Sequence, residues 1–273
     1  MSIAVYVACH KKFKKPFPAH RFLKYIEVGR YFHSKKIFRI NDAEGDSISY
    51  KNLNYNELTA LYWIWKNDNK NDIVGLCHYR RYFKSLTAKS RFSSRQLLKP
   101  KEIKHILQSN DMIAIPIGPF GINCLQKPPT GRSFKSRIHD KGSWISPEDV
   151  ETMKGIILRL YGKKFATALD TILDRNWNYM LNMFISRKSI FDSYCAWLFP
   201  LLTELEKNIN LEERVGQAKR IFGFWGEYLL NVYIYGKNLK VCGVEHIEKE
   251  GSVWASLKFK INQILKKIFK RNK

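Results

Sequence analysis

Acidic residues are scarce in this sequence. The 273-residue chain has 24 Asp and Glu against 48 Lys and Arg, which gives a formal net charge of +24. Such an imbalance predicts an anionic partner, and it fits nucleic acid, an acidic membrane surface or a phosphorylated substrate. The net charge therefore indicates that the partner is negatively charged, but it does not distinguish among these classes.

Paired cysteines and long apolar runs are also missing. No two cysteines have the Cys-x-x-Cys spacing of a zinc site, so we expect reduced core residues at Cys9, Cys77, Cys124, Cys195 and Cys242. No apolar run reaches the roughly 18 residues of a membrane span, and the apolar stretch at residues 3–9 is too short for a secretory signal. These absences predict a cytoplasmic protein.

Strand and helix patterns alternate along the first part of the chain. Residues 3–9 and the apolar run after Asp72 have the composition of buried strands, and residues 54–67 between them carry apolar side chains at helical spacing. Asn54 and Glu57 are interpreted as a capping box at the start of this helix. The strand–helix–strand order predicts an α/β fold with a parallel sheet.

The second part continues the α/β pattern. A strand is expected from Asp111, then a loop at 118–146 that either borders an active site, which we favour, or is a poorly ordered insertion. Further expectations are a helix with Pro147 in its first turn, a strand at 178–188, a helix kinked at Pro200, a helix from near Gly226 to Gly236 and a strand at 239–247. Together these elements predict one domain over residues 1–250, with a mostly parallel sheet flanked by helices.

The C-terminal tail differs from the rest of the chain. Residues 253–273 contain seven basic residues and no acid. One helical face would carry Trp254, Leu257, Ile261, Ile264, Leu265 and Ile268. We predict that residues 251–273 form an amphipathic helix on an anionic membrane surface. A helix packed on the domain and a frayed basic tail remain the alternatives.

A histidine and two arginines follow the apolar run after Asp72. In a strand, alternate side chains share a face, so we expect His78 and Arg80 to point one way and Tyr79 and Arg81 the other. Open α/β sheets bind ligands beyond the carboxyl ends of their strands, and paired arginines can grip a diphosphate there. The alternative is a structural salt bridge, for example to Glu57, and both interpretations stay open.

The same region lacks a motif that a diphosphate site often has. Many enzymes that use nucleotide-diphosphate sugars end a corresponding strand with Asp-x-Asp, which holds a divalent metal, and no Asp-x-Asp occurs here. With such a donor, fixed cations would have to neutralise the leaving diphosphate. We therefore predict neither a metal nor another cofactor, and no glycine-rich phosphate loop or Ser/His/Asp ordering stands out.

Five segments of the chain resemble a known family. They are YVACHKK, ISYKNLNYNELTALYWIWKND, VGLCHYRRYF, YMLNMFISRKSIFDSYCAWLFPLLTELEK and RIFGFWGEYLLNVYI. In this order, from Tyr6 to about Ile234, they resemble the blocks of a bacterial capsular and exopolysaccharide glycosyltransferase family first defined as a domain of unknown function. The resemblance implies a GT-A-like fold and transfer of galactose or galactofuranose from a UDP-sugar to a lipid-linked saccharide of capsule, O-antigen or lipopolysaccharide core. Residues 118–144 depart most from the family pattern, which leaves the acceptor least defined.

The resemblance also implies roles for particular residues. Glu227 would be the general base of an inverting, metal-independent transfer, although retaining chemistry stays open and the carboxylate could simply favour a helix N-terminus. Arg80 and Arg81, helped by His78, would stabilise the charge that grows on the departing UDP.

Weaker candidates complete this site. His10 and Lys11 end the first strand, where a nucleotide could lie, and the alternative is that they are solvated loop residues. Asn182 lies on a strand that resembles the sugar-facing strand of the fold, or it is a buried structural residue. His139 and Asp140 could touch the acceptor.

Two other functions remain open at this stage. One is a non-catalytic scaffold of a polysaccharide assembly complex, and the other is a basic nucleic-acid-binding protein. No nucleic-acid-binding motif is recognised, so no nucleic-acid partner is expected. The favoured hypothesis places the protein on the inner face of the cell membrane, with a UDP-sugar, a lipid-linked oligosaccharide and anionic lipid as partners, and it leaves the oligomeric state undefined.

Overall fold

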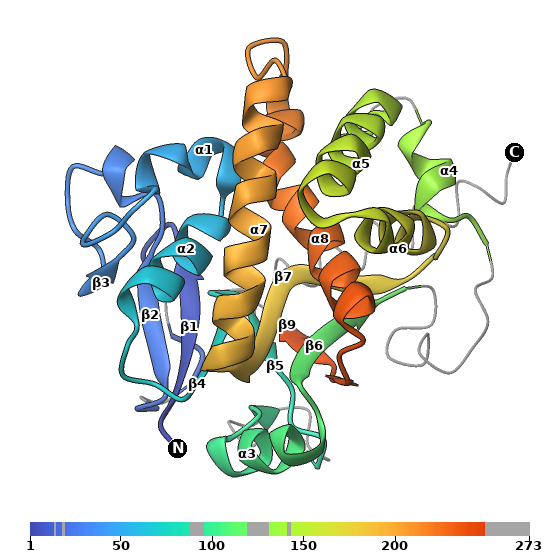
Figure 1. Cartoon of the computed structure of the whole chain (residues 1–273). Helices are drawn as coiled ribbons and strands as arrows, with labels where there is room; N and C mark the ends of the chain where they lie inside the picture. Colours follow the sequence, from blue (N-terminus) through green and yellow to red (C-terminus); the bar gives the residue numbers. More distant parts are fainter. Residues whose placement is uncertain (14, 18–19, 88–95, 119–130, 141–142, 249–273) are drawn as a thin grey trace, which may run out of the picture.

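A single mixed sheet organises the chain (Figure 1). The structure is a computed structural model and describes residues 1–13, 15–17, 20–87, 96–118, 131–140 and 143–248. The main path of the sheet has the order β3 (Ile40–Asn41), β2 (Leu23–Glu27), β1 (Ile3–Cys9), β4 (Ile73–His78), β7 (Asn178–Arg187), β6 (Met112–Ile117) and β8 (Val241–Gly243). Off this path, β5 (Arg81–Phe83) pairs with β4 and with β9 (His246–Glu248).

The direction of the strands confirms the predicted fold class. Strands β3, β2, β1 and β4 run parallel to one another, β6 runs parallel to β8, and β7 is antiparallel to both β4 and β6. The fold is therefore α/β with a mostly parallel sheet. Because β1, β2 and β4 are parallel, their carboxyl ends meet at one edge, where the polar residues of the site gather.

Helices cover both faces of the sheet (Figure 1). One face packs against α2, α5, α6, α7 and α8 in the larger core cluster, and the other packs against α3 in a second cluster. The helices are α1 (Asn52–Tyr55), α2 (Leu58–Asn67), α3 (Pro100–Ser109), α4 (Phe134–Ile138), α5 (Pro147–Tyr161), α6 (Lys163–Leu173), α7 (Lys188–Asn208) and α8 (Ile221–Lys237). Short 3-10 turns include η1 (Arg30–Phe32), η2 (Ser49–Lys51) and η5 (Gly216–Arg220).

Several local predictions are confirmed. Strands occur at β1, β4, β6 and β7, and α5 begins at Pro147. Helix α7 contains Pro200 and continues to Asn208, and the kink expected at Pro200 stays a prediction. Free cysteines occupy buried positions at Cys9, Cys77 and Cys195 and a half-buried one at Cys242, whereas Cys124 lies outside the described residues.

Two helix starts differ from prediction, and both differences matter for the site. The helix expected at 54–67 is divided, because Asn56 adopts φ 52° between α1 and α2, so the capping box of Asn54 and Glu57 is wrong. Helix α8 begins at Ile221 instead of near Gly226, since Ile221 and Trp225 are fully buried and extend its apolar face toward the N-terminus. Glu227 therefore lies in the second turn of α8, away from the helix N-terminus.

Other elements were not expected from the sequence. Strand β2 and helices α3 and α6 had no prediction, and the late strand at 239–247 is two short strands, β8 and β9. Residues 119–130 and 141–142 of the predicted loop, and the whole predicted tail helix, lie outside the described residues. Within the described part of the chain, no helix has the length and apolarity to cross a membrane.

Candidate functional site

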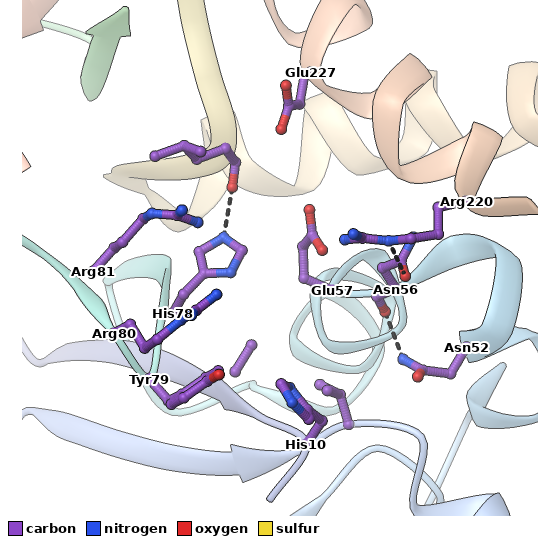
Figure 2. A pocket seen from close by; sticks show the side chains of 13 residues that line it. His10, Asn52, Asn56, Glu57, His78, Tyr79, Arg80, Arg81, Arg220 and Glu227 are labelled. Atoms are coloured by element: carbon purple, nitrogen blue, oxygen red, sulfur yellow. Dashed lines mark hydrogen bonds between the residues drawn. The ribbon is translucent and has the colours of Figure 1, made fainter. Parts of the chain in front are cut away.

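A cavity of about 410 Å³ opens at the carboxyl ends of β1 and β4. Figure 2 shows two kinds of charged side chain facing each other across it. On one side lies a cationic wall, which we define as His78, Tyr79, Arg80 and Arg81. On the other lies a carboxylate wall, which we define as Glu57, Glu227 and the residues that hold them, Asn56, Leu181 and Asn182.

The cationic wall is a tight hairpin. Strand β4 ends at His78, which pairs with Arg81 of β5, so Tyr79 and Arg80 form the turn between them. The chain reverses after His78, and the expected alternation of faces is therefore wrong. All four side chains line the same cavity.

Each charged group of the cationic wall has a protein contact. Nε2 of His78 lies 2.6 Å from the carbonyl oxygen of Leu181, and since a carbonyl only accepts, Nε2 carries a proton and donates it. The guanidinium of Arg80 lies 5.2 Å from the centre of the Tyr79 ring. Arg81 forms a salt bridge of 3.4 Å with Glu248, so the structural pairing considered for this arginine exists with a different partner from Glu57.

Arg220 brings a further cation that the sequence analysis did not single out. It ends η5, immediately before α8, and its guanidinium faces the cavity beside Glu57 (Figure 2). Its Nε donates to Oδ1 of Asn56 at 2.9 Å. One arginine in a strongly basic chain carries no sequence signal, and only the packing of α8 against α1 reveals its position.

The carboxylate wall is assembled by Asn182. Its Nδ2 donates to Oε1 of Glu57 at 2.7 Å and to the carbonyl oxygen of Gly223 at 2.9 Å. Asn182 is only 1% exposed, so its side chain lies behind the two carboxylates and does not line the cavity. A Cβ atom at Gly226 would lie 2.7 Å from Oδ1 of Asn182, which shows that glycine permits this close approach of α8.

Backbone strain accompanies this arrangement. Leu181 and Asn182 are consecutive residues of β7 with φ 72° and 51°, and Asn56 has φ 52°. The first two interrupt the regular path of β7 and aim the Leu181 carbonyl at His78, while the third brings Glu57 to the cavity. Strained backbone of this kind persists where the surrounding structure holds it, and it commonly clusters at functional sites.

Glu227 has an unusual protonation equilibrium. Its half-buried carboxyl group has a pKa raised to about 8, chiefly by desolvation and then by the negative charge of Glu57. The backbone amide of Leu181 and the charges of Arg220 and Arg81 act in the opposite direction. Such a group can exchange a proton near neutral pH, as a general acid or base must.

The remaining predicted residues are divided between the cavity and the outer surface. His10 lines the cavity, with its ring 5.0 Å from Tyr79, and partial desolvation, followed by the charge of Lys11, lowers its pKa. Lys11 does not line the cavity but lies over the outer part of the same tyrosine, 5.7 Å from the ring centre.

His139 and Asp140 lie on the exposed end of α4 and do not line the cavity. Asp140 accepts two hydrogen bonds from Arg132, at 2.7 and 3.0 Å, and these lower its pKa. The six residues of the predicted membrane-surface face lie outside the described part of the chain: Trp254, Leu257, Ile261, Ile264, Leu265 and Ile268.

Part of the cavity wall was not predicted from the sequence. Glu57 was considered as a helix cap and as a salt-bridge partner, and Asn52, Asn56 and Arg220 had no binding role. No cluster of three or more His, Cys, Asp or Glu side chains suited to a metal ion occurs among the described residues. The cavity thus offers cations for a negatively charged ligand and, opposite them, a carboxyl group able to accept a proton.

Comparison with solved structures defines the class of fold. The structure titled "WbbM bifunctional glycosytransferase apo structure" matches with a TM-score of 0.74 and 27% sequence identity over 91% of this chain. The fold is therefore GT-A-like, as the sequence resemblance implied. The chain spans 45% of that longer protein.

Comparison with families gives the membership of the chain. Residues 4–238 match the family described as "Domain of unknown function (DUF4422)", and the chain belongs to this family. The expected family is confirmed to this extent. No curated protein matches the chain.

Proposed function

We propose that the protein is a glycosyltransferase that moves a hexose, galactose or galactofuranose, from a UDP-sugar to a lipid-linked saccharide. The observation that carries this proposal is the cavity in which arginines face a carboxyl group of raised pKa. Similarity to a structure titled as a bifunctional glycosyltransferase supports the class of reaction. The family resemblance supports the setting, which is capsule, O-antigen or lipopolysaccharide-core assembly on the inner face of the cell membrane.

In this mechanism the cationic wall holds the diphosphate of the donor. Arg80 and Arg81 lie on a hairpin whose main chain is fixed by the sheet, and Arg220 adds a guanidinium from the opposite side. Fixed guanidinium groups stabilise negative charge as it develops on the departing UDP, without the need to reorganise. In this proposal the arginine side chains neutralise the charge of the diphosphate, and the reaction needs no metal.

Glu227 supplies the base of the proposed reaction. Its carboxylate removes the proton of the acceptor hydroxyl, the freed oxygen attacks the anomeric carbon, and the bond to UDP breaks with its electron pair leaving on the diphosphate. Attack opposite the leaving group inverts the anomeric centre. A pKa near 8 suits the step, because a base is most effective when its pKa lies close to the working pH.

Glu57 has a supporting role in this scheme. Asn182 occupies its Oε1, which leaves the other carboxylate oxygen to accept hydrogen bonds from hydroxyl groups of the transferred sugar. Its negative charge also raises the pKa of Glu227 and so strengthens that base. Asn182 is then a positioning residue, since it acts on the site only through Glu57.

Calorimetry with UDP-, GDP-, CMP- and dTDP-sugars, first in EDTA and then with Mn²⁺, tests the proposal. Saturable binding of a UDP-sugar in EDTA is the expected result, followed by slow hydrolysis or transfer of the same sugar. Binding that requires Mn²⁺ would contradict the role given to the arginines. If no nucleotide sugar binds in either buffer, the glycosyltransferase assignment fails, and a non-catalytic scaffold becomes the better explanation.

A further inference from the structure

Large apolar side chains gather beside the mouth of the cavity, outside it. Tyr31 and Phe32 of η1, Tyr50 of η2 and Leu53 of α1 are 67%, 45%, 55% and 64% exposed. The Tyr31 ring lies 5.2 Å from Phe32 and 6.3 Å from Tyr50, and Leu53 follows Tyr50 by one helical turn. We call these four residues the aromatic patch. Scattered exposed apolar residues need no explanation, but a contiguous group of this size does.

The aromatic patch rests on a rigid support. The buried carboxylate of Asp42 accepts hydrogen bonds from the backbone amides of Gly29 and Arg30 and from the hydroxyl groups of Ser49 and Thr59. The amide of Tyr31 donates in turn to the Ser49 hydroxyl at 3.2 Å. One buried acid thus fixes η1 and η2 side by side, so the rings are held outward by specific bonds and are not exposed through local fraying.

Basic residues lie near the patch, in the same segment of the chain or beside α1. Arg30 and Lys35 belong to the same segment as the first two rings, and exposed Lys219 adjoins α1, where its carbonyl accepts a hydrogen bond from Asn54. The acids Glu44 and Glu206 in this region are paired with Lys36 and Lys51. Aromatic and leucine side chains with basic neighbours are the combination that favours the interface of an anionic bilayer.

We propose that the aromatic patch docks the folded domain on an anionic lipid bilayer. The patch and the cavity share a wall, because Asn52 lines the cavity between Tyr50 and Leu53 in the sequence, and η1 directly follows the cavity residue Val28 and Gly29. Figure 1 shows α1 near the end of the sheet that carries β3. Docking through the patch would therefore bring this wall of the cavity close to the lipid surface. The proposal concerns the folded domain and does not depend on catalysis or on the C-terminal tail.

Vesicle binding of the full chain tests the proposal. The variant Tyr50→Ser/Leu53→Ser should lower partition onto vesicles of phosphatidylglycerol and phosphatidylcholine by about tenfold, since each side chain loses burial in the interface. The matched control Tyr235→Ser/Leu158→Ser removes the same residue types, 48% and 52% exposed, from α8 and α5 and should bind as the unaltered chain does. Both variants keep residues 249–273, so their difference reports on the patch alone.

Hydrogen exchange is a second measurement, and it distinguishes vesicle binding through the patch from vesicle binding through residues 249–273. Vesicles should slow exchange in peptides that cover residues 29–33 and 49–55 and leave peptides from α5 unchanged. Equal vesicle binding by the two double variants, without protection at these peptides, would overturn the proposal. It would also be overturned if the patch variant abolished self-association in sedimentation while vesicle binding persisted, because the patch would then be a protein interface. The protein should bind weakly to vesicles of phosphatidylcholine alone. Equally tight binding to them would contradict the role given to the basic residues near the patch.

Discussion

The two walls of the cavity are built in different ways. The cationic wall consists of four consecutive residues, His78 to Arg81, fixed by one hairpin. The carboxylate wall joins Glu57, Asn182 and Glu227, and its central hydrogen bond links residues 125 positions apart. The first wall is encoded locally, whereas the second exists only when α2, β7 and α8 are packed together.

The walls also differ in their energetic cost. Among the described residues, four that are not glycine have positive φ, and three of these, Asn56, Leu181 and Asn182, belong to the carboxylate wall. Oδ1 of Asn182 is buried without a hydrogen-bond partner there, and the Glu227 carboxyl is held at a pKa of about 8. Each strained residue costs on the order of 1–3 kcal/mol, so this wall in particular lowers the stability of the folded protein. Such a cost is expected where the backbone geometry positions residues for ligand binding or for a reaction.

The largest effect on the transfer rate should come from replacing Glu227 in the carboxylate wall. In Glu227→Gln the side chain keeps its shape but cannot accept the acceptor proton, so we expect the transfer rate to fall by about 10²- to 10⁴-fold. UDP affinity should stay close to that of the unaltered enzyme, because the cationic wall is intact. Single-turnover transfer assays and calorimetry with UDP measure the two quantities separately.

The exposed residue Glu151 of α5 provides the matched control. Glu151→Gln removes the same charge far from the reaction and should leave transfer unchanged. Retained turnover in Glu227→Gln would remove the proposed base and direct attention to Glu57. A parallel loss of UDP binding would instead show that the two walls do not act independently.

A smaller effect is expected from the cationic wall. Arg80→Gln/Arg81→Gln removes two charge-assisted contacts to the diphosphate and should weaken UDP binding about 10- to 100-fold, with the rate falling as well. The fold should survive, because the Arg81–Glu248 pair is partly exposed, at 29% and 49% of the two side chains, and such pairs contribute less than about 1 kcal/mol.

Net charge must be separated from local contact in this test. Arg132→Gln/Arg159→Gln removes the same two charges from surface ion pairs with Asp140 and Glu204. This control should bind UDP normally at moderate ionic strength. If it weakens binding as much as the hairpin variant does, long-range attraction by the whole basic protein explains the affinity and the hairpin has no special role.

The contrast between the walls also explains what could be predicted from the sequence. The α/β class followed from strand and helix periodicity, and the hairpin residues could be singled out because they are neighbours in the chain. Asn56 could not be identified as a break, since its helical neighbours supply an uninterrupted apolar pattern and its φ of 52° depends on contacts with Asn52 and Arg220.

The start of α8 was misplaced for a related reason. Gly226 suggested a helix boundary, yet it lies inside α8, as Gly223 does, and these two glycines allow close contact with Asn182 and Asn56. A glycine that serves packing and a glycine that ends a helix have the same sequence signal. Arg220 could not be identified from the sequence, because no local pattern marks it. Residues whose position depends on tertiary contacts are thus the ones that sequence periodicity cannot supply.

The smallest expected effect concerns the stability cost of the carboxylate wall. The pKa of Glu227 is about 8 in the folded protein and about 4.5 as its ordinary value, so between these pH values the folded state holds a proton that the unfolded state has released. The free energy of unfolding therefore decreases as pH rises through this window. Glu227→Gln cannot ionise and escapes the penalty. Its melting temperature should match that of the unaltered protein near pH 5 and exceed it by roughly 2–6 °C near pH 8, whereas Glu151→Gln should show no such gain. Thermal melts of the three proteins across this range measure the difference, in which the titrating groups that do not interact with Glu227 cancel. A gain that does not grow with pH would mean that Glu227 ionises as an ordinary carboxyl, and the base assigned to the proposed reaction would lose its physical support.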